Sequence, residues 1–155
     1  MIVGRTAVGV REVLDEGELT LREGLSGDNW STRGSQLTVD GTSHPEMQIN
    51  VMNARAIALV AQDRARWPLA GGQLFIDLDL SEENLPPGTR LSLGSAIIEI
   101  TAIPHTGCKK FVERFGKDAV VFVNSEVGKQ LHLRGINAKV VCPGSIRVGD
   151  AVRKV

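Results

Sequence analysis

The stretch RLSLGSAIIEITAI, residues 90–103, holds two apolar runs on either side of a Gly-Ser pair. Short runs rich in β-branched side chains around a glycine-containing turn are typical of paired strands. We therefore expect strands over residues 90–93 and 96–103. Similar short apolar runs, separated by turn residues, indicate further strands along the chain. These are residues 6–14, 18–22, 37–39, 74–80, 138–141 and 146–152, the last broken by Gly149-Asp150.

Two segments favour helix instead. Residues 53–66 contain five alanines, the strongest helix formers, and stop short of Pro68, which disfavours helix in the residue before it. Residues 108–115 are expected to form a short helix that ends at Gly116. Residues 120–123 fit either a following helix or a strand. Many short strands with few helices predict a mainly β (α+β) fold, a barrel or a sandwich, in one domain over residues 1–155.

The composition excludes several classes of function. The 155 residues include 18 Lys+Arg and 18 Asp+Glu, and this zero net charge argues against a general nucleic-acid binder. Aromatic residues make up only 4% of the chain, so a stacking platform for single-stranded nucleic acid is not expected. No apolar run reaches the ~20 residues of a membrane span. Charges also interrupt the N-terminal segment too early for a secretion signal, so we expect a cytoplasmic protein without a membrane partner.

The segment PHTGCKKF, residues 104–111, is the richest in reactive side chains. It follows an apolar strand, and the ends of strands often display functional groups on a rigid support. Cys108 is followed by Lys109 and Lys110 and lies near the start of an expected helix, two features that favour the thiolate. The alternative is a half-buried cysteine beside solvated lysines.

A structural zinc site is not predicted. His105 precedes Cys108 by three residues, so the pair could share a metal ion, but zinc sites draw four ligands at recognisable spacing. His44, His132 and Cys142 are scattered along the chain. Because Cys142 ends an apolar strand, we expect it to be buried as a small apolar side chain.

Two Gly-Asp pairs lie in turn-like contexts. Asp28 closes the glycine-rich loop GLSGD, residues 24–28, and Asp150 follows Gly149. A carboxylate in such a turn usually accepts backbone N–H bonds, so we expect both to be structural rather than catalytic.

Four segments, taken in order, resemble the MOSC domain family, named for the C-terminal domain of molybdenum cofactor sulfurases. They are GLSGD (24–28), LFIDLDLSEENLPPGTRLSLGSAIIEIT (74–101), HTGCKKFVERFG (105–116) and RGINAKVVCPGSIRVGD (134–150). The resemblance spans most of the chain and implies a compact MOSC-type β-barrel with a few short helices. Cofactor-binding members usually carry Pro or Arg before the characteristic cysteine, whereas Gly107 stands there in this chain.

The resemblance also implies a cofactor and a site. The family is linked to the molybdenum cofactor (molybdopterin), to persulfide chemistry and, at family level, to pyridoxal phosphate. Cys108 matches the cysteine that ligates molybdenum in some members, and a thiolate suits such a metal centre. With Cys108 as metal ligand and His105 beside it as the second catalytic candidate, the expected cofactor-binding residues are Thr106, Gly107, Lys110, Arg114 and Arg134.

Three hypotheses follow. The first is a molybdenum-cofactor protein that reduces N-hydroxylated small molecules through Cys108, with electrons from a separate reductase. The second is a non-catalytic sulfur carrier or cofactor-handling module, with a persulfide on Cys108 supplied by a sulfurase. The third is a β-barrel binding domain without this chemistry. In the first, Lys110 and Arg114 would share one helix face, where they could hold the phosphate of the cofactor with Arg134.

Overall fold

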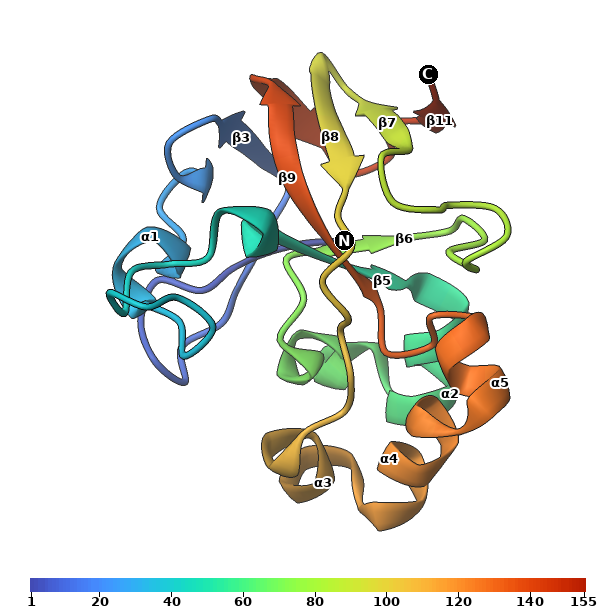
Figure 1. The fold of residues 1–155 in the computed structure, drawn as a ribbon. Helices are drawn as coiled ribbons and strands as arrows, with labels where there is room; N and C mark the ends of the chain where they lie inside the picture. The colour runs from blue at the N-terminus through green and yellow to red at the C-terminus, as the bar shows by residue number, and fades with distance from the viewer.

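The computed structural model describes all residues 1–155 and is built around a curled eight-stranded sheet, with a three-stranded sheet beside it (Figure 1). The large sheet runs in the order β11 (Val152–Lys154), β7 (Arg90–Leu93), β8 (Ala96–Ile100), β9 (Ile136–Cys142), β5 (Ile49–Asn53), β6 (Leu74–Ile76), β1 (Ile2–Gly4) and β2 (Glu12–Leu14). The small sheet is β10 (Gly144–Arg147), β3 (Glu16–Thr20) and β4 (Gly24–Leu25). All pairs are antiparallel except β5 with β6. The expected mainly β, barrel-like architecture is confirmed.

The β7–β8 hairpin forms where the sequence predicts it. Leu91 lies opposite Ile98 and Leu93 opposite Ala96, and all four side chains are buried. This alternation of buried and exposed positions is the period of two that a strand imposes. The turn needs Gly94, which has φ 55°, because a side chain there would collide with the backbone of β10.

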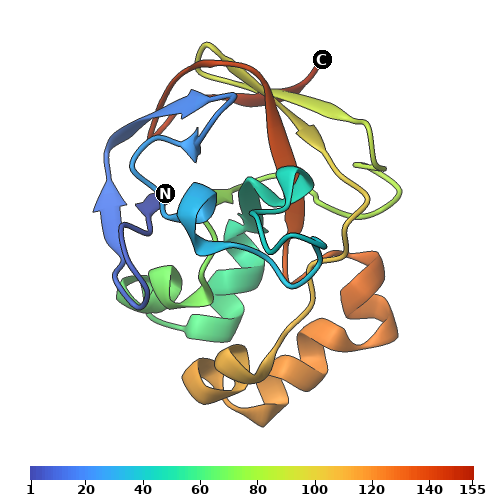
Figure 2. The same ribbon diagram turned by 60° about the vertical axis from the view of Figure 1, so that its left-hand side comes forward.

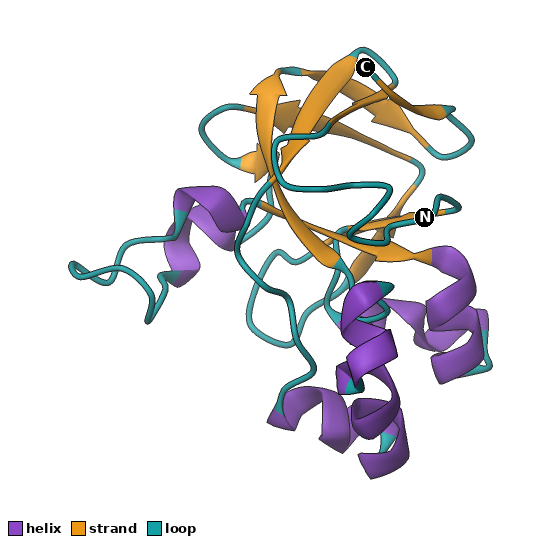
Figure 3. Cartoon of the chain, turned by 45° about the vertical axis from the view of Figure 1, so that its right-hand side comes forward, coloured by secondary structure: helices purple, strands orange, loops and turns teal.

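The helices gather at one end of the sheet, with α1 apart from the rest (Figures 1 and 3). They are α1 (Trp30–Arg33), α2 (Ala54–Ala61), α3 (Lys109–Phe115), α4 (Lys117–Asn124) and α5 (Glu126–Gln130), with 3-10 turns η1 (Pro45–Met47) and η2 (Arg64–Ala70). As expected, α3 follows Cys108 and ends at Gly116. Residues 120–123 belong to α4. None of these helices has the length and apolar character needed to cross a membrane.

Several expected boundaries are wrong for local reasons. The predicted strand 6–14 is a loop up to its last three residues, because Gly9 turns the chain with φ 83°. The predicted strand 74–80 ends at Ile76, after which Asp79 accepts the Ser81 N–H in a turn. The predicted strand 37–39 is an exposed turn. The predicted helix 53–66 stops at Ala61, because Gln62 adopts φ 62° and a 3-10 turn containing Pro68 follows.

Two apolar cores hold the fold together. The larger fills the interior of the curled sheets, while the smaller joins the sheet to the helices. Phe111 of α3 and Val123 of α4 are buried in the smaller core together with Met52 of β5. This second core fixes α3 beneath the end of the sheet, and with it the segment that carries Cys108 (Figure 2).

Candidate anion-binding and thiol site

A cavity of about 440 Å³ lies where the loop after β1, the 3-10 turn η2, helix α3 and the residues before β9 meet. We call it the cation pocket, and its defining residues are Arg5, Arg11, Arg33, Lys110, Arg114, Arg134, His105 and Cys108. Glu113 is the one acid in its lining. A chain with zero net charge thus concentrates positive charge around one thiol, which is the electrostatic signature of an anion site.

Only 6% of Arg134 is exposed, and unlike the equally buried Arg5 it has two nitrogens without a partner in the protein. Its Nη2 donates to the Ala70 carbonyl at 2.9 Å, and its guanidinium carbon lies 4.7 Å from the centre of the Phe111 ring. Its Nε and Nη1 atoms are buried and have no hydrogen-bond partner in the protein. A buried charged donor without an acceptor costs free energy, so Arg134 is poised to bind an acceptor from outside the chain.

Burial, with a smaller contribution from the positive charge of Arg114, lowers the pKa of Arg134 to about 10, although Cys108 acts in the opposite direction. Arg134 therefore remains a cation at neutral pH. Cys108 and Arg134 line the same cavity, so the thiol and the guanidinium lie near each other.

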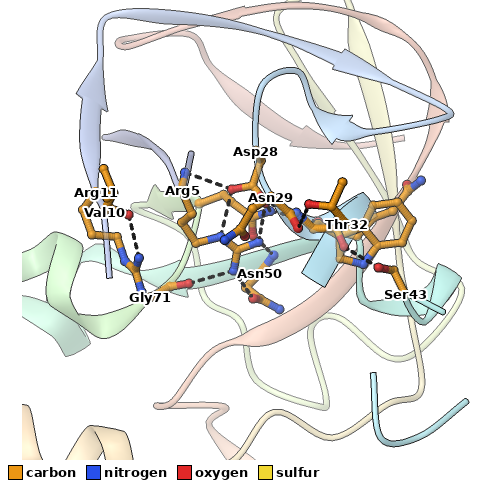
Figure 4. A network of polar contacts seen from close by, with 12 residues as sticks. Arg5, Val10, Arg11, Asp28, Asn29, Thr32, Ser43, Asn50 and Gly71 are labelled. Carbon is orange, nitrogen blue, oxygen red and sulfur yellow. Dashed lines mark hydrogen bonds and ion pairs between the residues drawn. The ribbon is translucent and has the colours of Figure 1, made fainter. Parts of the chain in front are cut away.

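Arg5 lies in the same pocket, but each of its three side-chain nitrogens has a partner within the chain. Asp28 accepts from its Nε and Nη2, both at 2.8 Å, while its Nη1 donates to Asn50 at 3.0 Å and to the Gly71 carbonyl at 3.1 Å (Figure 4). Asp28 also accepts the Trp30 N–H at 2.9 Å, so it has the expected turn-forming role within a buried ion pair. Arg5 adds charge to the pocket and ties the β1 end to the loop of Asp28.

Sequence reasoning missed Arg11, which lies on a loop, and Arg33, which ends α1, because neither belongs to a recognisable motif. Burial lowers the pKa of each, and the positive charge of Arg5 lowers both further, with Arg114 also acting on Arg11. Mutual repulsion of this kind is unfavourable unless an anion relieves it. The only sequence signal was their arginine identity near the glycine-rich segments, which is too weak to identify a site.

Lys110 and Arg114 line the cation pocket together, as their spacing on α3 predicts. Lys110 is exposed, while the Nη1 of Arg114 donates to the Leu69 carbonyl at 2.8 Å. Thr106 lines a different cavity, described below. Gly107 lines neither cavity, because Asn124 of α4 holds it: the Gly107 N–H donates to Asn124 Oδ1 at 2.8 Å and Asn124 Nδ2 donates to the Gly107 carbonyl at 3.0 Å.

Cys108 is exposed at the start of α3, and its carbonyl accepts the Phe111 N–H at 2.9 Å. The neighbouring His105 has a buried Nδ1 without a partner. Burial lowers the pKa of His105 well below its ordinary value, and the charges of Arg134, Arg5 and Arg33 add to this effect. His105 is therefore neutral at neutral pH.

The expected burial of Cys142 is wrong. Cys142 is the last residue of β9 and is exposed. The pairing of β9 with β8 is irregular between the buried Val140 and Cys142, so the strand no longer continues its buried side as far as Cys142. The chain places no group of three or more His, Cys, Asp or Glu side chains together around one point.

Comparison with known proteins agrees with this architecture. The model of the MOSC domain matches residues 42–153. Among solved structures, the YuaD protein from Bacillus subtilis has a TM-score of 0.70 at 17% identity, over 97% of this chain and 91% of that one. YiiM from Escherichia coli has a TM-score of 0.61 at 21% identity, over 99% and 67% of the two chains.

A third solved structure, described as a hypothetical protein, has a TM-score of 0.64 at 21% identity. It covers 99% of this chain, which spans only 66% of its length. At these identities the structures establish the fold alone. No curated protein matches the sequence.

Proposed function

The chain belongs to the MOSC domain family, and on that premise we propose that the cation pocket binds the molybdenum cofactor with Cys108 as its metal ligand. MOSC domains are associated with this cofactor at the level of the family. The observation that carries the proposal is Arg134, a buried cation with two unpartnered nitrogens beside an exposed thiol.

The residues present fit the two ends of such a cofactor. A phosphate needs several N–H donors and positive charge, which Arg134 supplies with Arg11, Arg33 and Arg114 around it. A soft metal needs a thiolate, and Cys108 lines the same cavity. No acid other than Glu113 opposes an anion there.

The proposed reaction is reduction of the N–O bond of an N-hydroxylated small molecule. It consumes two electrons and two protons and releases water, and a separate reductase would supply the electrons. When bound, the cofactor supplies the two-electron redox chemistry. Arg134 would hold the phosphate of the cofactor, and the neutral His105 lines the same cavity as the thiol. As a neutral imidazole, His105 can accept a proton at its unpartnered Nδ1, and the two protons that the reaction consumes would come from solvent.

The decisive experiment is metal and pterin analysis after purification from a molybdopterin-competent host. We expect nearly one molybdenum and one pterin per wild-type chain, and strongly reduced contents in Cys108→Ser and Arg134→Gln. Cys142→Ser is the matched control, because it removes the other exposed thiol, and it should retain wild-type contents. Equal pterin contents in all four proteins would exclude the cofactor from this pocket.

A sulfur-carrier function is a second candidate, favoured by the exposure of Cys108. A sulfur donor can reach this thiol directly, and the resulting persulfide anion would face the cations of the pocket. After incubation with a cysteine desulfurase and cysteine, intact mass analysis should show one added sulfur on Cys108. Protein that lacks pterin and gains sulfur at Cys108 would favour the carrier over the reductase.

A further inference from the structure

A second cavity, of about 700 Å³, is lined by residues 100–106, by residues 134–137 and by parts of α5. It shares only His105 and Arg134 with the cation pocket. These two residues therefore form a common wall between the cavities. The volume lies within the range of sites that enclose small organic ligands.

The second cavity has an apolar floor. Ile100 of β8, Ile136 of β9 and Leu85 are all buried and line it, together with Val123 of α4. Such side chains bind the hydrocarbon part of a ligand through the hydrophobic effect. The exposed acids Glu82 and Glu126 and the exposed Lys129 also line this cavity.

The common wall offers polar groups that the protein itself does not satisfy. They are Nε and Nη1 of Arg134 and Nδ1 of His105, all buried without a partner. Arg134 can only donate, and it carries a positive charge. Because Arg134 has two unpartnered nitrogens, one can face the phosphate proposed for the cation pocket and the other an acceptor group in the second cavity. A ligand there would place its acceptor or anionic group at this wall and its apolar body over the floor.

The turn before β9 holds this cavity in a preformed shape. His132 adopts φ 48°, and its Nδ1 lies 2.6 Å from the Leu80 carbonyl. Gly135 adopts φ 106°, and a side chain there would collide with the backbone of Val51. A non-glycine residue held at positive φ requires support from its surroundings, so these contacts fix the lining rather than leave it mobile.

We propose that the second cavity binds the apolar body of a small organic acid or other acceptor-bearing molecule, whose acceptor end lies at the wall formed by His105 and Arg134. The inference rests on the proposed function. The substrate would enter through the second cavity, with its reactive end pointing toward the side of the wall where Cys108 lies. The proposed substrates share an apolar body and an electron-rich head group.

Three probes that share one ring separate the requirements of the head group: benzoate, benzamide and benzamidinium. We expect benzoate to bind most tightly in isothermal titration calorimetry, benzamide less tightly and benzamidinium least. Ala102→Trp and Gln130→Trp place a large ring at two exposed positions that line the second cavity. Each should weaken benzoate binding by about tenfold through loss of space. Val121→Trp, at an exposed position of α4 outside the cavity, is the control and should leave binding unchanged.

Three results would overturn the proposal. Unchanged benzoate affinity in both cavity variants would show that benzoate does not bind in the second cavity. Weaker binding in Arg33→Ala, without an effect of Ala102→Trp, would show that benzoate binds in the cation pocket instead. Tightest binding of benzamidinium would overturn the acceptor-bearing class. Molybdenum content is measured on the same samples, so protein without molybdenum that still binds benzoate in the second cavity contradicts the proposed function alone.

Discussion

Arg134 is a buried cation that receives one carbonyl and one aromatic face from the protein, while two of its nitrogens remain without an acceptor. Such a residue contributes little to the free energy of unfolding, because the cost of desolvating its charge offsets the favourable energy of its contacts. We therefore expect Arg134→Met to leave the melting temperature of the ligand-free protein unchanged or slightly higher. The same substitution should abolish the stabilisation that inorganic phosphate gives to the wild type.

The effect of phosphate on Arg134 also has a defined pH dependence. With a pKa of about 10, the guanidinium stays cationic at neutral pH and loses its proton as the pH rises through that value. Stabilisation by phosphate should therefore persist up to about pH 9 and decline toward pH 10 and above. Thermal melting with and without phosphate measures this, with the exposed Arg22→Met as control. Equal loss of stabilisation in both variants would show that phosphate acts through general charge.

The two Gly-Asp pairs differ in burial and therefore in their predicted contributions to stability. Asp28 is buried and pairs with Arg5, so Asp28→Asn leaves a buried cation poorly compensated and should lower the free energy of unfolding by about 3–5 kcal/mol. Asp150 is exposed and accepts the Arg147 N–H at 2.7 Å, so Asp150→Asn should cost about 1 kcal/mol or less. Urea denaturation compares the variants directly. Similar losses in both would refute the structural importance assigned to the Arg5–Asp28 pair.

At the scale of elements, the sequence pattern predicted those strands and helices that are determined by interactions between residues close in the chain. The β7–β8 hairpin and the α3 helix with its glycine end were recognisable because alternation and a C-terminal glycine act over a few residues. Strand 6–14 was overestimated because the apolar run contains Gly9, whose positive φ turns the chain before the strand begins.

The cation pocket shows why the rest of the site could not be read from the sequence. The family resemblance supplied Cys108, Lys110, Arg114 and Arg134, all within or near two of its motifs. Arg11 reaches the same cavity from a loop and Arg33 from the end of α1, both far away in the chain, through tertiary packing that no periodicity encodes. Burial, which makes Arg134 unusual, is likewise a property of the folded state.

Asn124 ends α4 and ties it to the segment before Cys108. Its side chain makes two hydrogen bonds with Gly107, and a Cβ on Gly107 would lie 2.6 Å from Val120, so this contact needs both residues as they are. Asn124→Ala should lower the free energy of unfolding by about 1–3 kcal/mol. It should also speed amide hydrogen exchange at Gly107. Asn84→Ala, at a half-buried asparagine in another loop, is the control, and unchanged exchange at Gly107 in Asn124→Ala would show that packing alone holds the segment.

At the scale of the whole molecule, the net charge is zero, yet positive side chains are concentrated around one pocket. Positive side chains from the N-terminal loops, α3 and the start of β9 converge around Cys108, whereas Cys142 lies at the other end of β9, outside that pocket. Both thiols are exposed, so access does not distinguish them. The local charge does distinguish them, because the cations around Cys108 attract an anionic reagent.

The two cysteines therefore test the charge distribution of the folded protein. At low salt, an anionic aromatic disulfide reagent should modify Cys108 about tenfold faster than Cys142, as expected for steering by a local cluster of charge. The ratio should fall as salt is added, because the screening length shrinks from about 10 Å at 0.1 M to about 3 Å at 1 M. The neutral reagent iodoacetamide should discriminate less, since it lacks the attraction and reports only the thiolate fraction and access. Rates are read as peptide masses over time in Cys108→Ser, Cys142→Ser and wild type. Faster modification of Cys142 by the anionic reagent, or a ratio that does not respond to salt, would mean that the cations of the pocket do not act on Cys108.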